Sequence, residues 1–109
     1  MAGKFETYAG KDGKHYFKLK AGNGEPILQS QGYKAKTDCK NGIESVRRNS
    51  KEGKRFEAMT AKNGKHYFVL KATNGQVIGT SEMYNSPASC KNGIESVQRN
   101  APDARVAEA

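Results

Sequence analysis

The octapeptide CKNGIESV occurs twice in this chain, beginning at Cys39 and again at Cys90. Shifting the sequence by 51 positions lays residues 5–49 over residues 56–100 without a gap, and 26 of the 45 aligned pairs are identical. A fixed period is the signature of a repeated supersecondary unit, and two copies are too few for a solenoid. The duplication therefore predicts one closed domain with pseudo-two-fold symmetry, an intramolecular counterpart of a symmetric dimer.

Each copy begins with the pattern of a three-stranded antiparallel meander. Asp-Gly and Asn-Gly pairs supply tight turns between short strand-like runs, because both accept the positive φ angles of such turns. In the run His15–Lys20 the first, third and fifth residues form one face, with Phe17 and Leu19 as its apolar members. The second copy repeats the run at His66–Lys71, and third strands are expected around Ile27 and Ile78.

The rest of each copy has the pattern of a helix. Cys39, Ile43 and Val46 follow the i, i+4, i+7 spacing of a buried helical stripe, and the second copy repeats them. Ser86-Pro87 supplies a capping hydroxyl and a proline at the first helical position, whereas the first copy lacks both. Gly42 lies beside the stripe and has a counterpart in the second copy, which predicts close approach of each helix to the sheet.

The expected fold class is α+β, with one antiparallel sheet and two helices packed on one face. Repeat 1 is placed at residues 4–50 and repeat 2 at 55–101. A short C-terminal tail covers 102–109 and is expected to end in a strand. Because two units in one chain complete each other's sheet, we expect a monomer.

Both copies carry a longer motif, F-E-x-Y, G-K-x-x-F-x-L-K-A-x-N-G-x-x-I, S-x-x-Y and N-G-I-x-S-V-x-x-N. The matching residues in the first copy are Phe5, Gly13, Phe17, Leu19, Lys20, Asn23, Gly24, Ile27, Ser30, Tyr33, Asn41, Gly42, Ile43, Ser45 and Val46. In this the chain resembles the YegP-like family of small bacterial proteins, nearly throughout except for the tail. The second copy departs from the motif at Met59, where the family has tyrosine.

The resemblance implies a fold but no catalytic residues, because the family is functionally uncharacterised. It implies tandem β3-α-β units that share one sheet and exchange their C-terminal strands. Arg55–Met59 would then also close the first unit, and a short strand near Arg105–Ala107 would close the second.

Composition points to a small soluble protein rather than to a membrane or secreted one. The chain has no apolar run long enough to cross a membrane and no pattern of an export signal. Two cysteines do not make a secreted disulfide framework, so a cytoplasmic location is expected. The formal net charge of +8 fits either a polyanion partner or simple solubility.

His15, His66, Cys39 and Cys90 are the residues from which a metal or nucleophile site would be built. Zinc needs four such ligands in a tetrahedron, and neither C-x-x-C nor H-x-x-H spacing is present. A Cys/His nucleophile pair would lack an orienting third group. Because both cysteines fall in the helical apolar stripe, core packing is the favoured interpretation. We therefore expect no metal, no cofactor and no enzymatic activity.

The sheet face opposite Phe17 and Leu19 is the candidate nucleic-acid surface. It presents Tyr16, Lys18 and Lys20 from the first copy, with Tyr67 and Lys71 from the second. Interleaved aromatic and basic residues on an open sheet bind single strands by base stacking and phosphate neutralisation. A solvated antiparallel face would have the same composition, and valine takes one lysine's place in the second copy.

The outer helix face is the candidate partner-binding surface. It comprises Asn41, Glu44, Ser45, Arg48, Asn92, Glu95, Ser96 and Arg99, identical between the copies although other positions diverged. Glu44–Arg48 and Glu95–Arg99 are expected i,i+4 ion pairs. Recent duplication is the simpler explanation for this identity. The sequence thus indicates a non-enzymatic cytosolic binding or interaction module of unknown role, with a weak single-stranded nucleic acid binder as the alternative.

Overall fold

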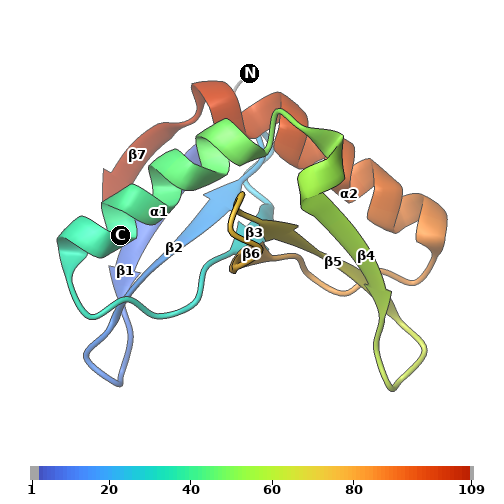
Figure 1. Ribbon diagram of the computed structural model, residues 1–109, viewed down its shortest axis with the longest axis horizontal. Helices are drawn as coiled ribbons and strands as arrows, with labels where there is room; N and C mark the ends of the chain where they lie inside the picture. Colours follow the sequence, from blue (N-terminus) through green and yellow to red (C-terminus); the bar gives the residue numbers. More distant parts are fainter. Residues whose placement is uncertain (1–2, 109) are drawn as a thin grey trace.

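The computed structural model describes residues 3–108 and has the same element order in both repeats (Figure 1). Repeat 1 contains β1 (Lys4–Ala9), β2 (His15–Lys20), β3 (Pro26–Gln29) and α1 (Lys36–Asn49). Repeat 2 contains β4 (Phe56–Thr60), β5 (His66–Lys71), β6 (Val77–Thr80) and α2 (Pro87–Asn100). A 3-10 turn, η1 (Gly53–Arg55), precedes β4, and η2 (Ala101–Asp103) leads into β7 (Arg105–Glu108).

All seven strands form one sheet in the order β4-β5-β6-β3-β2-β1-β7. The repeats meet at β3 and β6, where Gln29 lies opposite Thr80. Most neighbours are antiparallel, but β7 runs parallel to β1, so the sheet is mixed and not wholly antiparallel as expected. The physical reason is the connection: β1 and β7 are the first and last strands of the chain, so no hairpin turn between them requires an antiparallel pair.

The C-terminal strands are exchanged between the repeats. β7 follows repeat 2 in the chain but pairs with β1 of repeat 1, and β4 follows α1 but pairs with β5. This arrangement agrees with the exchange implied by the YegP-like resemblance. β4 begins at Phe56 because Arg55 is the last residue of η1.

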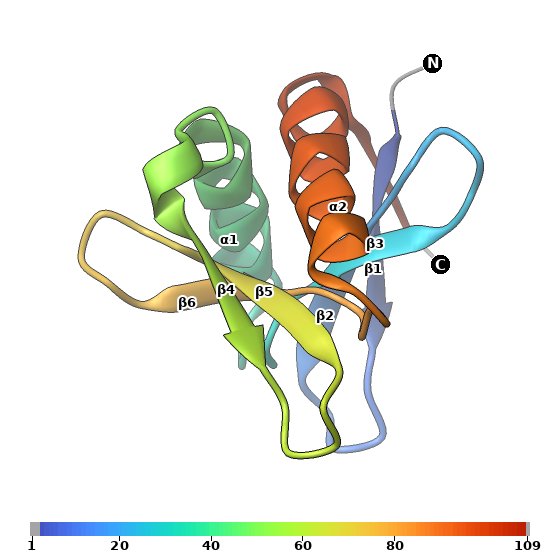
Figure 2. The same ribbon diagram turned by 90° about the vertical axis from the view of Figure 1, so that its right-hand side faces the viewer.

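The helices lie side by side on one face of the sheet (Figure 2), and each half of the sheet slopes away from the centre beneath one helix (Figure 1). The apolar stripe of each helix faces the sheet, and Cys39, Ile43 and Val46 are at most 2% exposed. Phe17 and Leu19 of β2 are fully buried below them. The alternation of the strands and the spacing of the helices are therefore confirmed. Among the described residues, no helix is long and apolar enough to cross a membrane.

The helix starts differ as the sequence indicates. The Ser86 hydroxyl accepts a hydrogen bond from the Ser89 amide at 3.1 Å, and Pro87 opens α2. Ala35 at the start of α1 supplies no side-chain cap. A serine cap stabilises a helix by roughly 1 kcal/mol, so α1 depends more on its packing than α2 does.

A tyrosine explains the glycine in each helix. Tyr33 stacks on Phe17 with ring centroids 6.3 Å apart, and its hydroxyl lies under Gly42. A β-carbon on Gly42 would lie 2.5 Å from that oxygen. Tyr84 and Phe68 repeat the arrangement below Gly93. The close approach of helix and sheet is confirmed, and its cause is a partly buried phenol ring.

The pseudo-two-fold axis passes between two equivalent but unlike residues. Leu28 and Gly79 occupy the same position in β3 and β6, the strands at which the repeats meet. Leu28 is 1% exposed, and a β-carbon built on Gly79 would lie 2.7 Å from its Cδ2 atom. The Leu28 side chain thus fills the space that glycine leaves at position 79, where two leucines would collide.

Candidate functional site

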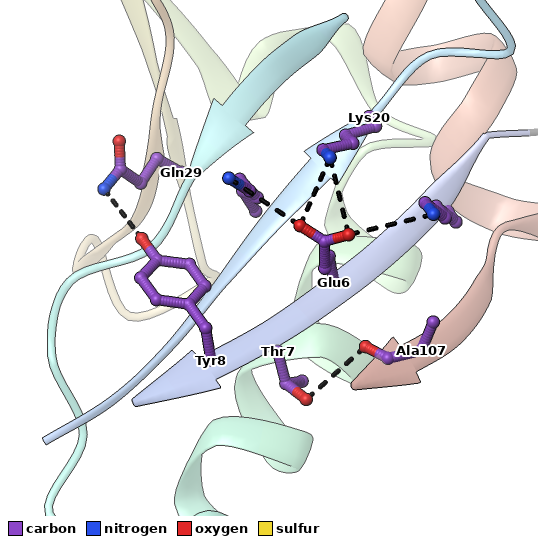
Figure 3. Close-up of polar contacts among 8 residues, drawn as sticks. Glu6, Thr7, Tyr8, Lys20, Gln29 and Ala107 are labelled. Carbon is purple, nitrogen blue, oxygen red and sulfur yellow. Dashed lines mark hydrogen bonds and ion pairs between the residues drawn. The ribbon is translucent and has the colours of Figure 1, made fainter. Parts of the chain in front are cut away.

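The open face of repeat 1 carries an aromatic pair beside a lysine. The rings of Tyr8 and Tyr16 stack with centroids 5.5 Å apart and planes 13° apart. The Lys18 ammonium lies 5.3 Å from the centre of the Tyr8 ring. The Tyr8 hydroxyl accepts from the Gln29 amide at 3.0 Å (Figure 3). Tyr16 donates to Asp12 at 2.6 Å, an interaction that raises the pKa of the Tyr16 phenol. Both rings are therefore held in place by polar contacts at their outer ends.

The lysines of this face share one carboxylate. Glu6 lies 3.2 Å from Lys20 and 3.7 Å from both Lys4 and Lys18 (Figure 3). The hydrogen bond from Lys20, together with the charges of all three lysines, lowers the pKa of Glu6. Part of the positive potential expected from Lys18 and Lys20 is therefore neutralised by a residue of the neighbouring strand.

Repeat 2 does not reproduce the aromatic-basic face. Tyr67 lies opposite Met59 and has no tyrosine beside it. Val69 stands where the first repeat has Lys18, and Lys71 pairs with Glu57 at 2.5 Å. The predicted two-copy platform is thus concentrated in repeat 1. Tyr8 was not predicted to belong to this face, although the first F-E-x-Y motif contains it.

The outer helix face is exposed in part. Asn41, Glu44 and Arg48 are exposed, but Ser45 is half-buried because the Asn49 amide donates to its carbonyl at 2.8 Å and to its hydroxyl at 3.1 Å. The predicted Glu44–Arg48 pair is wrong, since Glu44 pairs with Arg47 at 2.5 Å. Arg47 also donates to the backbone carbonyl of Ala104, and Arg48 is exposed to solvent.

The second helix repeats this pattern with one change. Asn92, Glu95 and Arg99 are exposed, and Ser96 accepts from the Asn100 amide at 2.8 and 3.2 Å. Among residues 3–108, no ion pair joins Glu95 to Arg99, so this prediction is also wrong. A serine is present at this position in both repeats for a structural reason. Ser45 and Ser96 each accept hydrogen bonds from a buried asparagine, Asn49 or Asn100, which was not predicted from the sequence.

A third surface lies between β4 and α2. We name it the β4–α2 groove, a concavity of about 250 Å³. It is lined by Ala58, Met59, Thr60, His66, Pro87, Cys90, Lys91 and Ile94. The corresponding hollow of repeat 1 is the β1–α1 groove, of about 190 Å³, lined by Thr7, Tyr8, Ala9, His15, Lys36, Cys39, Lys40 and Glu108.

The β1–α1 groove is closed at the sheet edge by β7. The Thr7 hydroxyl donates to the Ala107 carbonyl at 3.5 Å (Figure 3), and Glu108 lies 3.9 Å from Lys36. Arg47 of α1 donates to the Ala104 carbonyl just before the strand. The last strand of the chain is thus fixed to both walls of the groove.

The β4–α2 groove has no such strand. Within residues 3–108, β5 is the sole neighbour of β4 in the sheet. Phe5 and Ile43 are 0% and 1% exposed in repeat 1, whereas their counterparts Phe56 and Ile94 are partly exposed. A count of strands explains the difference: two β3-α-β units would supply eight, but β4 both ends the first unit and begins the second.

The histidines and cysteines are divided between the two grooves. Cys39 and Cys90 are free and buried, and burial raises the pKa of both thiols. His15 and His66 are half-buried, each in the groove of its own repeat. Within the described part of the chain, no three metal-binding side chains form a cluster. The core position expected for the cysteines is confirmed.

Comparison with known proteins identifies the family. The model of the domain of unknown function DUF1508 matches the chain twice, at residues 11–57 and 61–108. The chain belongs to the DUF1508 family. Its YegP-like resemblance is thereby confirmed, and the family match again separates the two repeats.

Members of the DUF1508 family with half of their residues identical to this chain carry names that state no function. The UPF0339 protein in the ptx operon 5′ region of Stutzerimonas stutzeri is 51% identical over 108 residues, covering 99% of this chain and 97% of that protein. UPF0339 protein YegP of Escherichia coli K12 is 49% identical over 106 residues, covering 97% and 96%. The solution NMR structure of E. coli yegP, a protein of unknown function, superposes with a TM-score of 0.94 at 49% identity, covering 99% of this chain and 93% of that one.

Proposed function

We propose that this chain is a non-enzymatic, cytoplasmic protein-binding module that takes an extended segment of another protein onto the outer edge of β4. The observation that carries the proposal is the difference between the two grooves. β7 fills the edge position beside β1, while the same position beside β4 is open. An open strand edge offers a row of backbone donors and acceptors to an incoming strand.

Side-chain burial supports the same surface. Phe56 and Ile94 belong to the core cluster but keep part of their surface in water. An added strand would remove that apolar surface from water, at roughly 25 cal/mol per Å². The outer helix face offers no comparable gain, because its exposed side chains are polar.

The test compares one groove variant with one helix-face variant. Ala58 is exposed in the groove, so Ala58→Glu places a charge where the strand would lie. We expect it to abolish capture of a partner from a nuclease-treated bacterial extract, while Glu95→Lys leaves capture unchanged. Amide hydrogen exchange on the purified complex should show new protection in β4. Loss of capture by the helix-face variant alone would refute the proposal.

A second candidate function rests on the Tyr8–Tyr16 pair and its adjoining lysines. Stacked rings beside a cation suit a single-stranded nucleic acid, with each stacked base contributing about 1–3 kcal/mol. The neutralisation of these lysines by Glu6 reduces the electrostatic part of such binding. We therefore rank this function below protein binding.

Titration of a fluorescent oligonucleotide at low and physiological salt tests the second function. Tyr8→Ala with Tyr16→Ala should weaken binding with little change in its salt dependence, and Tyr67→Ala is the matched control in repeat 2. Lys18→Gln with Lys20→Gln should lower the salt slope by roughly 0.7 for each lost phosphate contact. Binding that is unchanged by the tyrosine pair is nonspecific attraction to a chain of net charge +8.

A further inference from the structure

The strand that pairs with β1 shows what kind of segment fits beside β4. β7 runs parallel to β1 with Val106 opposite Phe5, Ala107 opposite Glu6 and Glu108 opposite Thr7. Moved by 51 positions, an equivalent strand would place its apolar residue opposite Phe56. Its acidic residue would lie opposite Ala58.

We propose that the β4–α2 groove binds a partner segment that runs parallel to β4 and reads apolar, small, acidic. This inference rests on the proposed function and specifies its ligand. The apolar position follows from the partly exposed Phe56 and Ile94, which an aliphatic side chain would cover.

The acidic position follows from the charges that line the groove. Lys91 is a cation among the residues that line the groove, and none of them is a carboxylate. Lys91 is exposed and has the position that Lys40 has in the first groove. In repeat 1 the corresponding Glu108 lies 3.9 Å from Lys36, whose counterpart in repeat 2 is Pro87. Lys91 is therefore the lysine of this groove that a carboxylate opposite Ala58 would meet.

The proposed direction is that of β7, which runs parallel to β1. A segment with the same order of side chains, bound antiparallel, would place the carboxylate opposite Phe56. It would then bury a charge against an aromatic ring and leave the Lys91 side of the groove unpaired, which costs free energy. Parallel addition satisfies both positions at once.

The test uses synthetic peptides on the intact chain. The probe APDARVAEA corresponds to residues 101–109 and carries the proposed pattern. A second peptide carries Glu108→Lys, and a third has the reversed sequence. Binding is measured by chemical-shift titration to millimolar peptide, and amide exchange locates the bound strand at β4 or at β1.

We expect the probe to protect β4 and the charge-reversed peptide to bind about fivefold more weakly, as the loss of one exposed ion pair predicts. In the Lys91→Glu chain this preference should reverse, whereas in the matched Lys40→Glu chain it should persist. Restoration by charge exchange is an effect that a merely weakened fold would not produce.

The other outcomes separate the inference from the proposed function. Equal protection of β4 by all three peptides would overturn the sequence pattern and leave strand addition in place. Protection confined to β1 would mean that the probe displaces β7, which overturns the inference. If no peptide protects β4 at any concentration, both fall. Dimerisation of the free chain that Ala58→Glu abolishes would assign the groove to a second copy instead.

Discussion

The packing of Leu28 against Gly79 makes a quantitative prediction about the centre of the sheet. A β-carbon on Gly79 would lie 2.7 Å from two atoms of Leu28, closer than folded proteins allow. Leu28 is 1% exposed, so its side chain has little room to move aside. Gly79→Ala should therefore destabilise the protein by about 1–3 kcal/mol through overpacking. Leu28→Ala alone should cost about 2–5 kcal/mol, because it leaves a cavity.

The double variant decides whether the two positions share one space. In the Leu28→Ala background the added methyl group no longer collides and fills part of the cavity. Gly79→Ala should then be neutral or stabilising, which gives a coupling free energy on the order of 1–3 kcal/mol.

Urea unfolding of the four chains measures each free energy of unfolding, with unchanged slopes as a check on two-state behaviour. Thr60→Ala, three strands from Leu28 at the far edge, is the control. It should be additive with Leu28→Ala within about 0.3–0.5 kcal/mol. If Gly79→Ala costs as much in the Leu28→Ala background as in the native chain, the packing argument is refuted.

Three further predictions follow from the core. Gly93→Ala should destabilise the protein despite its better helix propensity, since the new methyl group overlaps the Tyr84 hydroxyl, and Tyr84→Phe should restore part of the loss in thermal unfolding. Cys39 and Cys90 should resist a thiol reagent until the chain unfolds. Burial raises the pKa of both thiols, so the stability linked to them is present below about pH 8.5 and is lost as pH rises through their pKa in the folded state. Urea unfolding at a series of pH values should therefore show a free energy of unfolding that falls as pH rises through this range. The chain should sediment as a monomer. Halves made by cutting near Ser50 should fold only when mixed, because the helix of each repeat also packs against the central strand of the other. Circular dichroism of the separate and mixed halves measures this.

Periodicity was enough to predict most of the fold. The alternation in β2 and the stripe Cys39, Ile43 and Val46 are local patterns, and each has one physical meaning. Because of the duplication, each pattern can be identified independently in both repeats. The parallel direction of β7 could not be obtained in this way. It depends on where α2 ends relative to β1, which is a property of packing and not of any short segment.

The candidate surfaces were harder to predict because charge pairing is decided across strands and turns. Glu6 lies on β1 and neutralises lysines of β2, a relation that depends on the register between the strands. Glu44 pairs with Arg47 because that side chain is already drawn toward the sheet edge by the Ala104 carbonyl. Helical spacing alone cannot distinguish the i+3 partner from the i+4 partner.

Identity between the repeats is a poor guide to function in this chain. The paired serines on the helices are retained for a buried asparagine, and Gly42 and Gly93 for a partly buried tyrosine. A symmetric dimer of one repeat would have to place the same residue on both sides of its axis and would cover both edges with exchanged strands. A fused chain has neither constraint, because each position can change alone and one strand serves two units. Two departures from symmetry concern the sheet itself: the Leu28–Gly79 pair, which packs the centre, and the open edge of β4, which packs nothing within the described chain. Since the first departure is explained by stability and the second lowers it, the open edge is where a binding function is to be sought.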